Sequence, residues 1–234
     1  MKYSYDLHIH SVLSPCADEL QTPNNILNMC MLKGLNIVAV TDHNSLKQLP
    51  ILDGLKDSYN FLYVYGVEVT VLEGFHVIIY LENLDDAIKL DTYLEKCIKD
   101  EEPNSKQTIC DIYDNYVNEY HKSLNCILDL SYIDLLKIIR KLNGIIILAH
   151  LDRSLLINKS YIDIFDKLDF DAIELTKLCN INIFFNTYPI FKNYKYLINS
   201  DAHTLMEINE SNQFINLEDL TYKSLKSYLR KQND

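Results

Sequence analysis

Apolar residues follow two patterns along the chain: short continuous runs that suit buried strands, and longer stretches with helical spacing. The clearest run, at residues 145–149, reads IIILA, and unbroken apolar runs of this length are typical of strands buried on both faces. Six further segments also read as strands. The predicted strands are at residues 3–10, 36–41, 61–71, 75–81, 145–149, 172–175 and 196–199.

Capping and breaking residues delimit the predicted helices. Thr22 and Pro23 suit the N-cap and first turn of a helix, and Gly34 suits its end. Ser131 caps another helix, which stops before Asn143. We predict helices at residues 23–33, 85–99, 131–142, 161–168 and 217–230, and a helix or pair of turns at 46–58. Residues 108–130 fit neither pattern.

Strands and helices thus alternate, which favours an α/β barrel or a doubly wound sheet. A three-residue gap containing Gly74 separates two of the predicted strands and indicates a hairpin. The sequence contains neither a Rossmann fingerprint nor a P-loop, which disfavours a nucleotide-binding sheet. No linker divides the chain, so we predict a single domain over residues 1–234.

The segment 100–130 is longer than a typical connection, and we expect it to form a lid or specificity element. Its Tyr113, Tyr116 and Tyr120 could stack on a base. Their spacing of three and four also suits one packed face of a helix. Both interpretations stay open.

Composition narrows the class of protein. Of the 234 residues, 48% are hydrophobic and 24% charged, which excludes dominant disorder. A net charge of −11 disfavours nonspecific adhesion to nucleic acid. No apolar run reaches the roughly 18 residues that span a bilayer, and the first residues do not resemble a signal peptide. We therefore expect a cytoplasmic protein without a membrane partner, whose six cysteines stay reduced.

Histidine is the residue type that points to a site. Six of the seven histidines lie at the margin of a predicted strand: His8, His10, His43, His76, His150 and His203. Acids lie within two residues of most of them, and Glu68 would reach the same end of the sheet as His76 if their strands pair antiparallel. The loops that follow barrel strands share one face, so these side chains should converge. His121 lies in a polar stretch and should be exposed.

Imidazole and carboxylate groups together are the ligands of Zn, Mn or Fe at hydrolytic sites. Without a cation, such a cluster would leave several costly, half-paired polar groups. The sequence therefore predicts a metal centre. Cys16 is the one cysteine close to the histidines in the sequence. It could bind the metal, or it could be a thiol of a loop or of the core.

Six motifs in order resemble the PHP family, named for polymerase and histidinol phosphatase. They are Asp-Leu-His-Ile-His-Ser at 6–11, Thr-Asp-His-Asn at 41–44, Gly-Val-Glu-Val-Thr at 66–70, Phe-His-Val at 75–77, Ala-His at 149–150 and Ser-Asp-Ala-His at 200–203. The resemblance covers residues 3–205. It implies a distorted (β/α)7 TIM-like barrel that binds two or three divalent metal ions, which could be Zn, Mn or Fe.

The resemblance also implies a set of ligands. His8, His10, Glu68 and Asp201 would hold one metal, and Glu68 would bridge to a second held by His76 and His150. A third would use His43, His203 and an acid from the loop after His10.

That loop reads Ser-Pro-Cys-Ala-Asp-Glu at 14–19, whereas the family often has Ser-Asp-Gly. We assign Asp18 as the ligand, with Glu19 and Cys16 as rivals. Asp6 and Asp42 fit a place behind the ligands, where each could accept the second N–H of an imidazole. Simple capping is the alternative for both.

These features predict a metal-dependent phosphoesterase that acts on a small phosphomonoester or a nucleotide. Two cations about 4 Å apart would bind one water and lower its pKa toward 7, which supplies a bridging hydroxide. His203 or Asp42 would handle the leaving-group proton. Arg153 could clamp phosphate or be a surface residue at a helix start, and Lys177 is a weaker candidate.

Three alternatives stay open: a nuclease acting on nucleic acid, a noncatalytic module that docks an ATPase or polymerase, and an amidohydrolase-like enzyme. The acidic charge favours a small substrate. The amidohydrolase interpretation lacks a Lys at a strand exit in the middle of the chain.

Overall fold

The computed structural model describes residues 1–230. Its main sheet has eight strands in the order β10-β1-β2-β3-β4-β7-β8-β9. Seven of these strands match the predicted ones: β1 (Lys2–Ile9), β2 (Ile37–Val40), β3 (Leu62–Thr70), β4 (His76–Leu81), β7 (Ile145–Leu148), β8 (Ala172–Glu174) and β9 (Lys195–Leu197). The eighth strand, β10 (Phe214–Asn216), pairs antiparallel with β1 and was not predicted.

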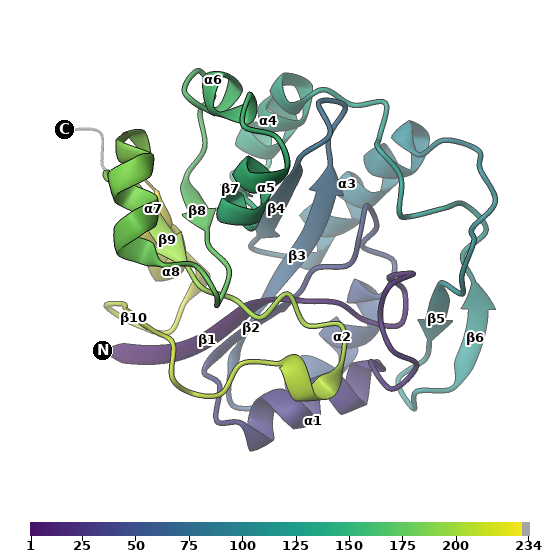
Figure 1. The fold of residues 1–234 in the computed structure, drawn as a ribbon. Helices are drawn as coiled ribbons and strands as arrows, with labels where there is room; N and C mark the ends of the chain where they lie inside the picture. The colour runs from purple at the N-terminus through teal and green to yellow at the C-terminus, as the bar shows by residue number, and fades with distance from the viewer. Residues whose placement is uncertain (231–234) are drawn as a thin grey trace.

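The sheet curls into a distorted barrel (Figure 1). Strands β1 to β3 are parallel, β4 is antiparallel to both of its neighbours, and β7 to β9 are parallel again. Beyond β9 the chain returns to the end of β1, where Ile9 and Ala202 form a parallel bridge. The backbone N–H of His10 donates to the Ala202 carbonyl at 2.9 Å. The prediction of an α/β, TIM-like barrel is therefore confirmed.

In the described part of the chain, seven helices pack against the outer face of the curled sheet, whereas the last helix packs against the cluster on its inner face (Figure 1). They are α1 (Pro23–Leu32), α2 (Leu49–Lys56), α3 (Leu84–Cys97), α4 (Tyr132–Lys141), α5 (Leu151–Ile157), α6 (Tyr161–Phe165), α7 (Ile181–Thr187) and α8 (Tyr222–Leu229), with short 3-10 turns η1 (Pro189–Phe191) and η2 (Leu205–Glu207). The predicted helices are all present, whereas α5 and α7 were not predicted. Among residues 1–230, no helix combines the length and the apolar character that crossing a membrane requires.

Of two predicted N-caps, Ser131 caps its helix and Thr22 does not. Ser131 accepts the Asp134 backbone N–H at 3.2 Å, as expected of an N-cap. The Thr22 hydroxyl instead donates to Asp114 at 2.6 Å, and the other oxygen of Asp114 accepts the Asn24 N–H at 3.0 Å. A side chain from a distant turn therefore caps α1 in place of Thr22.

The alternation of strand residues decides which side chains enter the barrel. Val67 and Val69 on β3 belong to the large core cluster shared with the outer helices. Val64 belongs to the second cluster, which includes Ile78 of β4 and fills the other face of the sheet. Because side chains alternate along a strand, Glu68 also points to this inner face.

Residues 100–130 contain a separate two-stranded sheet, β5 (Thr108–Cys110) and β6 (Tyr116–Glu119). The helix interpretation of the three tyrosines is therefore wrong: Tyr120 is buried, whereas Tyr113 and Tyr116 are exposed. The sequence did not predict this hairpin, because residues 108–130 show neither the alternation of a strand nor the spacing of a helix. A role of the segment as lid or specificity element stays a prediction.

Candidate metal centre

The barrel brings the strand-exit side chains together at one end, around Glu68. The Oε1 atom of Glu68 lies 2.9 Å from His76 Nδ1 and 3.0 Å from His150 Nε2. The hairpin explains part of this contact, because the β3–β4 register pairs Thr70 with His76 and leaves Glu68 two residues away. Glu68 and these two imidazoles form the group implied for the second metal.

The second oxygen of Glu68 faces the group implied for the first metal. His8, His10, Glu68 and Asp201 each offer one ligand atom, and these atoms lie within 4.8 Å of one another. The Nε2 atoms of His8 and His10 are both 3.4 Å from Glu68 Oε2. One oxygen of Asp201 lies 3.3 Å from His10 Nε2.

Two buried atoms at this point test whether a cation fits. Within residues 1–230, His8 Nε2 and Glu68 Oε2 are buried and form no well-aligned hydrogen bond, although they lie 3.4 Å apart and His43 Nδ1 lies 3.0 Å from Glu68 Oε2. Leaving such groups unpaired costs about 1–3 kcal/mol each. A cation between them would satisfy both atoms, so the residues fit the divalent metal that the fold implies.

Electrostatics keeps the central carboxylate ionised. Burial alone would raise the pKa of Glu68, but the charges of His8, His43 and His76 outweigh it and hold this pKa well below its usual range. Burial lowers the pKa of His10 to about 3, assisted by the charge of His43. Glu68 as carboxylate and His10 as neutral imidazole are the forms that bind metal ions.

Glu174 is a functional residue that the sequence did not reveal. Its carboxylate lies 3.0 Å from His8 Nδ1, accepts the His150 backbone N–H at 2.9 Å and accepts the Asn199 amide at 2.7 Å. It therefore fixes the His8 ring so that Nε2 points to the centre. The only available signal was an acid inside the otherwise apolar run 172–175.

Asp42 lies behind a candidate ligand, as expected, and reaches its imidazole through a serine. Its buried carboxylate accepts the Ser11 N–H at 2.7 Å and the hydroxyls of Ser11 and Ser14 at 2.6 and 2.7 Å. Ser14 Oγ lies 3.0 Å from His10 Nδ1. Asp42 thus positions His10 through Ser14, and it is not among the side chains that line the cavity. Its role in transferring the leaving-group proton stays a prediction.

Asp6 orients no imidazole. Its two oxygens accept the backbone N–H groups of Ser200 at 3.0 Å and Asn209 at 2.8 Å. Asp6 therefore holds the loop that carries Asp201, and the capping alternative describes it correctly. Lys177 donates to the Glu207 carbonyl at 2.8 Å and does not line the pocket.

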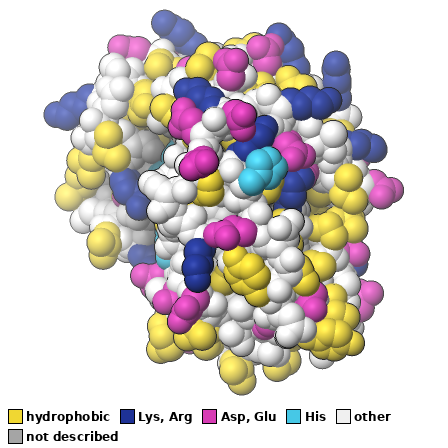
Figure 2. Space-filling model, turned by 90° about the vertical axis from the view of Figure 1, so that its right-hand side faces the viewer, with side chains coloured by type: hydrophobic (Ala, Val, Ile, Leu, Met, Phe, Trp, Pro, Cys, Tyr) yellow, Lys and Arg dark blue, Asp and Glu magenta, His cyan; other side chains and the backbone are white. Residues whose placement is uncertain are grey.

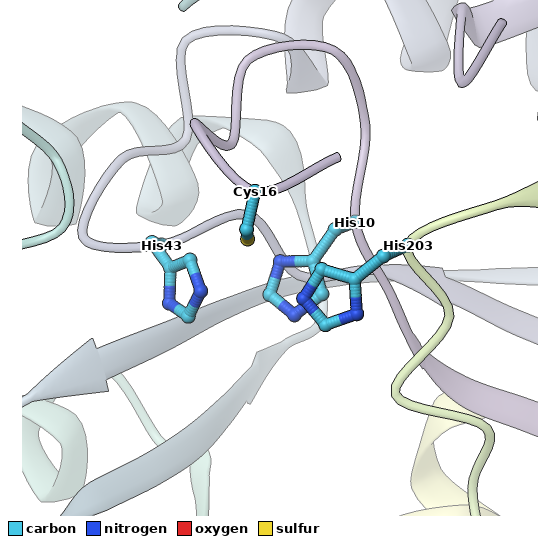
Figure 3. A group of neighbouring side chains, drawn as sticks. All are labelled: His10, Cys16, His43 and His203. Atoms are coloured by element: carbon cyan, nitrogen blue, oxygen red, sulfur yellow. The ribbon is translucent and has the colours of Figure 1, made fainter. Parts of the chain in front are cut away.

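The third group contains Cys16 in place of an acid (Figure 3). The ligand atoms of His10, Cys16, His43 and His203 lie within 4.8 Å of one another. Hydrogen bonds to His203 and His43 outweigh burial and lower the pKa of Cys16 to about 7.

The assignment of Asp18 is corrected accordingly. Cys16 and Asp18 are both exposed, but the Asp18 carboxylate accepts the Leu20 N–H at 2.9 Å, as in a turn, and does not belong to the group. Glu19 is exposed too and does not belong to the group. The turn conformation, which composition does not specify, directs the sulfur of Cys16 toward the three histidines. His121 is exposed, as expected.

Backbone strain gathers at the motifs. Asn44, His150 and Asp201 have φ of 54°, 29° and 53°, in the left-handed region that residues other than glycine seldom adopt. Such strain costs about 1–3 kcal/mol per residue and clusters at functional sites. The Asn44 side chain stabilises its own turn by bonding the Thr70 N–H at 2.9 Å and the Leu124 carbonyl at 2.8 Å.

The three groups open into a cavity of about 340 Å³. Arg153, at the start of α5, lines it and forms an ion pair with Asp201. An apolar wall made by Phe75, Ile157 and Tyr161 bounds the cavity on another side. The described part of segment 100–130 contributes no lining residue.

No family model matches the sequence. The uncharacterized protein MJ1587 of Methanocaldococcus jannaschii is 30% identical over 100 residues, which cover 39% of this chain and 58% of the relative. The match therefore spans less than two thirds of that relative.

Solved structures match nearly the whole chain. The lesion-specific endonuclease PfuEndoQ of Pyrococcus furiosus has a TM-score of 0.71 at 18% identity, covering 98% of this chain and 56% of its own. An amidohydrolase of Chromobacterium violaceum has a TM-score of 0.62 at 16% identity, covering 98% and 99%. A two-domain protein of Bacteroides vulgatus that contains a predicted PHP-like metal-dependent phosphoesterase has a TM-score of 0.58 at 13% identity, covering 98% and 62%.

These likenesses define the class: the chain has the PHP fold. The resemblance carried by six short motifs is thereby confirmed at the level of the fold.

Proposed function

We propose that this chain is a PHP-type, metal-dependent hydrolase of phosphate esters, with a small phosphomonoester or a nucleotide as substrate. One observation carries the proposal: the buried carboxylate of Glu68 has imidazoles on both oxygens, His76 and His150 beside Oε1 and His8, His10 and His43 beside Oε2. This arrangement suits a carboxylate that bridges two cations.

The residues divide among two or three divalent cations, which could be Zn, Mn or Fe. His8, His10, Glu68 and Asp201 would hold the first, and Glu68, His76 and His150 the second, with His43 also within reach of Glu68 and His76. Such cations activate a water molecule and neutralise charge on phosphoryl oxygens.

Two further side chains suit the handling of a phosphate ester. Arg153 is about half exposed at the cavity, so its guanidinium can leave Asp201 and bind two phosphoryl oxygens as a fork. His203 Nδ1 lies 2.8 Å from the Asp201 carbonyl, which fixes the ring and leaves Nε2 available. Because Asp42 is hydrogen-bonded to two serines, His203 is the remaining choice for the proton of the leaving oxygen when no cation is bound to its Nε2.

The cavity favours a small substrate. Its volume of about 340 Å³ is at the lower end for ligand pockets, which span roughly 300–1,000 Å³. Phe75 and Tyr161, with ring centroids 5.7 Å apart, form an apolar surface beside the metal ligands. A sugar or base attached to the phosphate could pack there.

A nuclease is the second candidate, and one structural neighbour favours it. Endonuclease Q, whose fold this chain shares, has been solved with a 27-mer duplex that carries an abasic lesion at the active site. The net charge of −11 weighs against a long polyanion. On the face drawn in Figure 2, basic and acidic side chains are interspersed rather than gathered by sign.

The test is a metal-reconstituted panel of mononucleotides, bisphosphates, histidinol phosphate and short oligonucleotides. We expect phosphate release from a small ester, and loss of both bound metal and activity in Asp201→Ala. Lys177→Ala is the matched control and should keep both, because Lys177 points to the Glu207 carbonyl outside the cavity. Bound metal without hydrolysis of any substrate would refute the proposal and favour a docking module. Cleavage of oligonucleotides alone would favour the nuclease.

A further inference from the structure

Cys16 lies where three histidines from three different parts of the chain meet. His10 follows β1, His43 follows β2 and His203 follows β9. The ring of His10 stacks on that of His203 with centroids 4.6 Å apart and lies 4.5 Å from that of His43. Figure 3 shows the Cys16 sulfur directed into the space between His43 and the other two rings.

The loop that carries Cys16 is tied to the opposite side of this space. The backbone N–H of Asp18 donates to the His203 carbonyl at 2.8 Å, and the Ala17 N–H donates to the Ser14 carbonyl at 3.0 Å. Cys16 therefore keeps its position relative to His203 although the loop is at the surface.

This group differs chemically from its two neighbours. Both neighbouring groups include the carboxylate of Glu68, whereas the donors here are one sulfur and imidazole nitrogens. Thiolate and imidazole ligands select Zn²⁺ and other thiophilic ions, whereas carboxylates also suit Mn²⁺. His203 directs Nδ1 to the Asp201 carbonyl, which leaves its Nε2 for a cation. His43 directs Nδ1 to Glu68 Oε2 at 3.0 Å, which leaves its Nε2 for the same cation.

We propose that Cys16, His43 and His203 form a thiolate–imidazole site that prefers Zn²⁺ to Mn²⁺, beside two carboxylate-containing positions without that preference. The inference rests on the proposed function in that the neighbouring groups are taken to bind cations. It gives one centre two kinds of ion selectivity, because a single cysteine replaces an acid.

Thiol alkylation of the full chain tests this without an activity assay. The metal-free protein is treated with iodoacetamide alone, with Zn²⁺ or with Mn²⁺, and the rate at each cysteine is mapped by peptide mass spectrometry. At a Zn²⁺ concentration ten times the dissociation constant, Cys16 should react about tenfold more slowly, and Mn²⁺ should have little effect. Cys179 is the internal control, since it is partly exposed and outside the group.

Cobalt substitution supplies a second readout. The wild type and Cys179→Ser should show a thiolate-to-cobalt charge-transfer band, and Cys16→Ser should lack it and bind one zinc fewer. Cys16→Asp should restore that ion with Mn²⁺ accepted as well. Equal alkylation of Cys16 with and without Zn²⁺, or a band that survives in Cys16→Ser, would overturn the proposal.

The two proposals fail in different ways. An unprotected Cys16 with cations still bound at the other groups rejects only the thiolate site. A protected Cys16 without hydrolysis of any ester rejects only the proposed function. Absence of cation binding at every group rejects both.

Discussion

The substitution Glu174→Gln removes the carboxylate that orients a metal ligand from behind. Glu174 is 2% exposed and serves three donors, namely His8 Nδ1, the Asn199 amide and the His150 backbone N–H, at 3.0, 2.7 and 2.9 Å. A glutamine amide keeps only one acceptor oxygen. In either orientation, its NH2 group therefore faces at least one of these donors.

The size of the effect follows from these contacts. A buried donor without an acceptor costs about 1–3 kcal/mol. Loss of the group that orients a ligating histidine typically weakens metal binding by about 10–100-fold, which is roughly 1.4–2.7 kcal/mol. We expect Glu174→Gln to lose metal affinity in this range and to be less stable without metal.

Competition with a chromophoric chelator measures the affinity, and urea unfolding in chelator measures the stability. Asp171→Asn is the matched control, because Asp171 is a buried acid at the opposite end of β8 that accepts the Ile146 N–H at 2.8 Å and pairs with Arg140 at 2.7 Å. It should lose stability but keep wild-type metal affinity. Wild-type affinity in Glu174→Gln, or an equal loss in both variants, would refute the reasoning.

Three other predictions concern packing, substrate binding and metal removal. Gly66→Ala should lower the free energy of unfolding by about 1–3 kcal/mol in urea titrations, because its Cβ would lie 2.5 Å from Thr41 Cγ2; an unchanged midpoint would contradict that close approach. Arg153→Met should raise KM for a phosphate ester while metal content, measured by elemental analysis, stays constant; a fall in metal content would instead assign Arg153 to the support of Asp201. Zn²⁺ at about 100 times its dissociation constant should raise the free energy of unfolding by about 2.7 kcal/mol relative to chelator-treated protein; equal thermal midpoints would argue against a metal centre.

The barrel strands could be predicted because their signal is local. The run 145–149 is apolar at every position, and a strand buried on both faces requires that pattern. The β3–β4 hairpin followed from the short gap with Gly74, which has a φ of 86°. The β5–β6 hairpin gave no such signal. All four residues of β6 are exposed, and its sequence mixes polar and apolar residues.

The candidate ligands could be predicted from position, because a histidine after a parallel strand, or at the start of the antiparallel β4, lies at the same end of the barrel whatever the loops do. The side chains that orient these ligands from behind could not be predicted in this way. Glu174 and His8 are 166 residues apart in the sequence, and no local pattern pairs them. The choice between Cys16 and Asp18 depended on the turn at 14–19, whose dihedral angles the sequence did not specify.

The metal content of the wild type and of Glu68→Ala, measured by elemental analysis after reconstitution, tests the central claim most directly. If Glu68 bridges two cations, the wild type should bind more than one equivalent per chain, and Glu68→Ala should bind clearly less at both carboxylate-containing positions. A wild type that binds less than one equivalent, or a Glu68→Ala variant with unchanged content, would contradict the account.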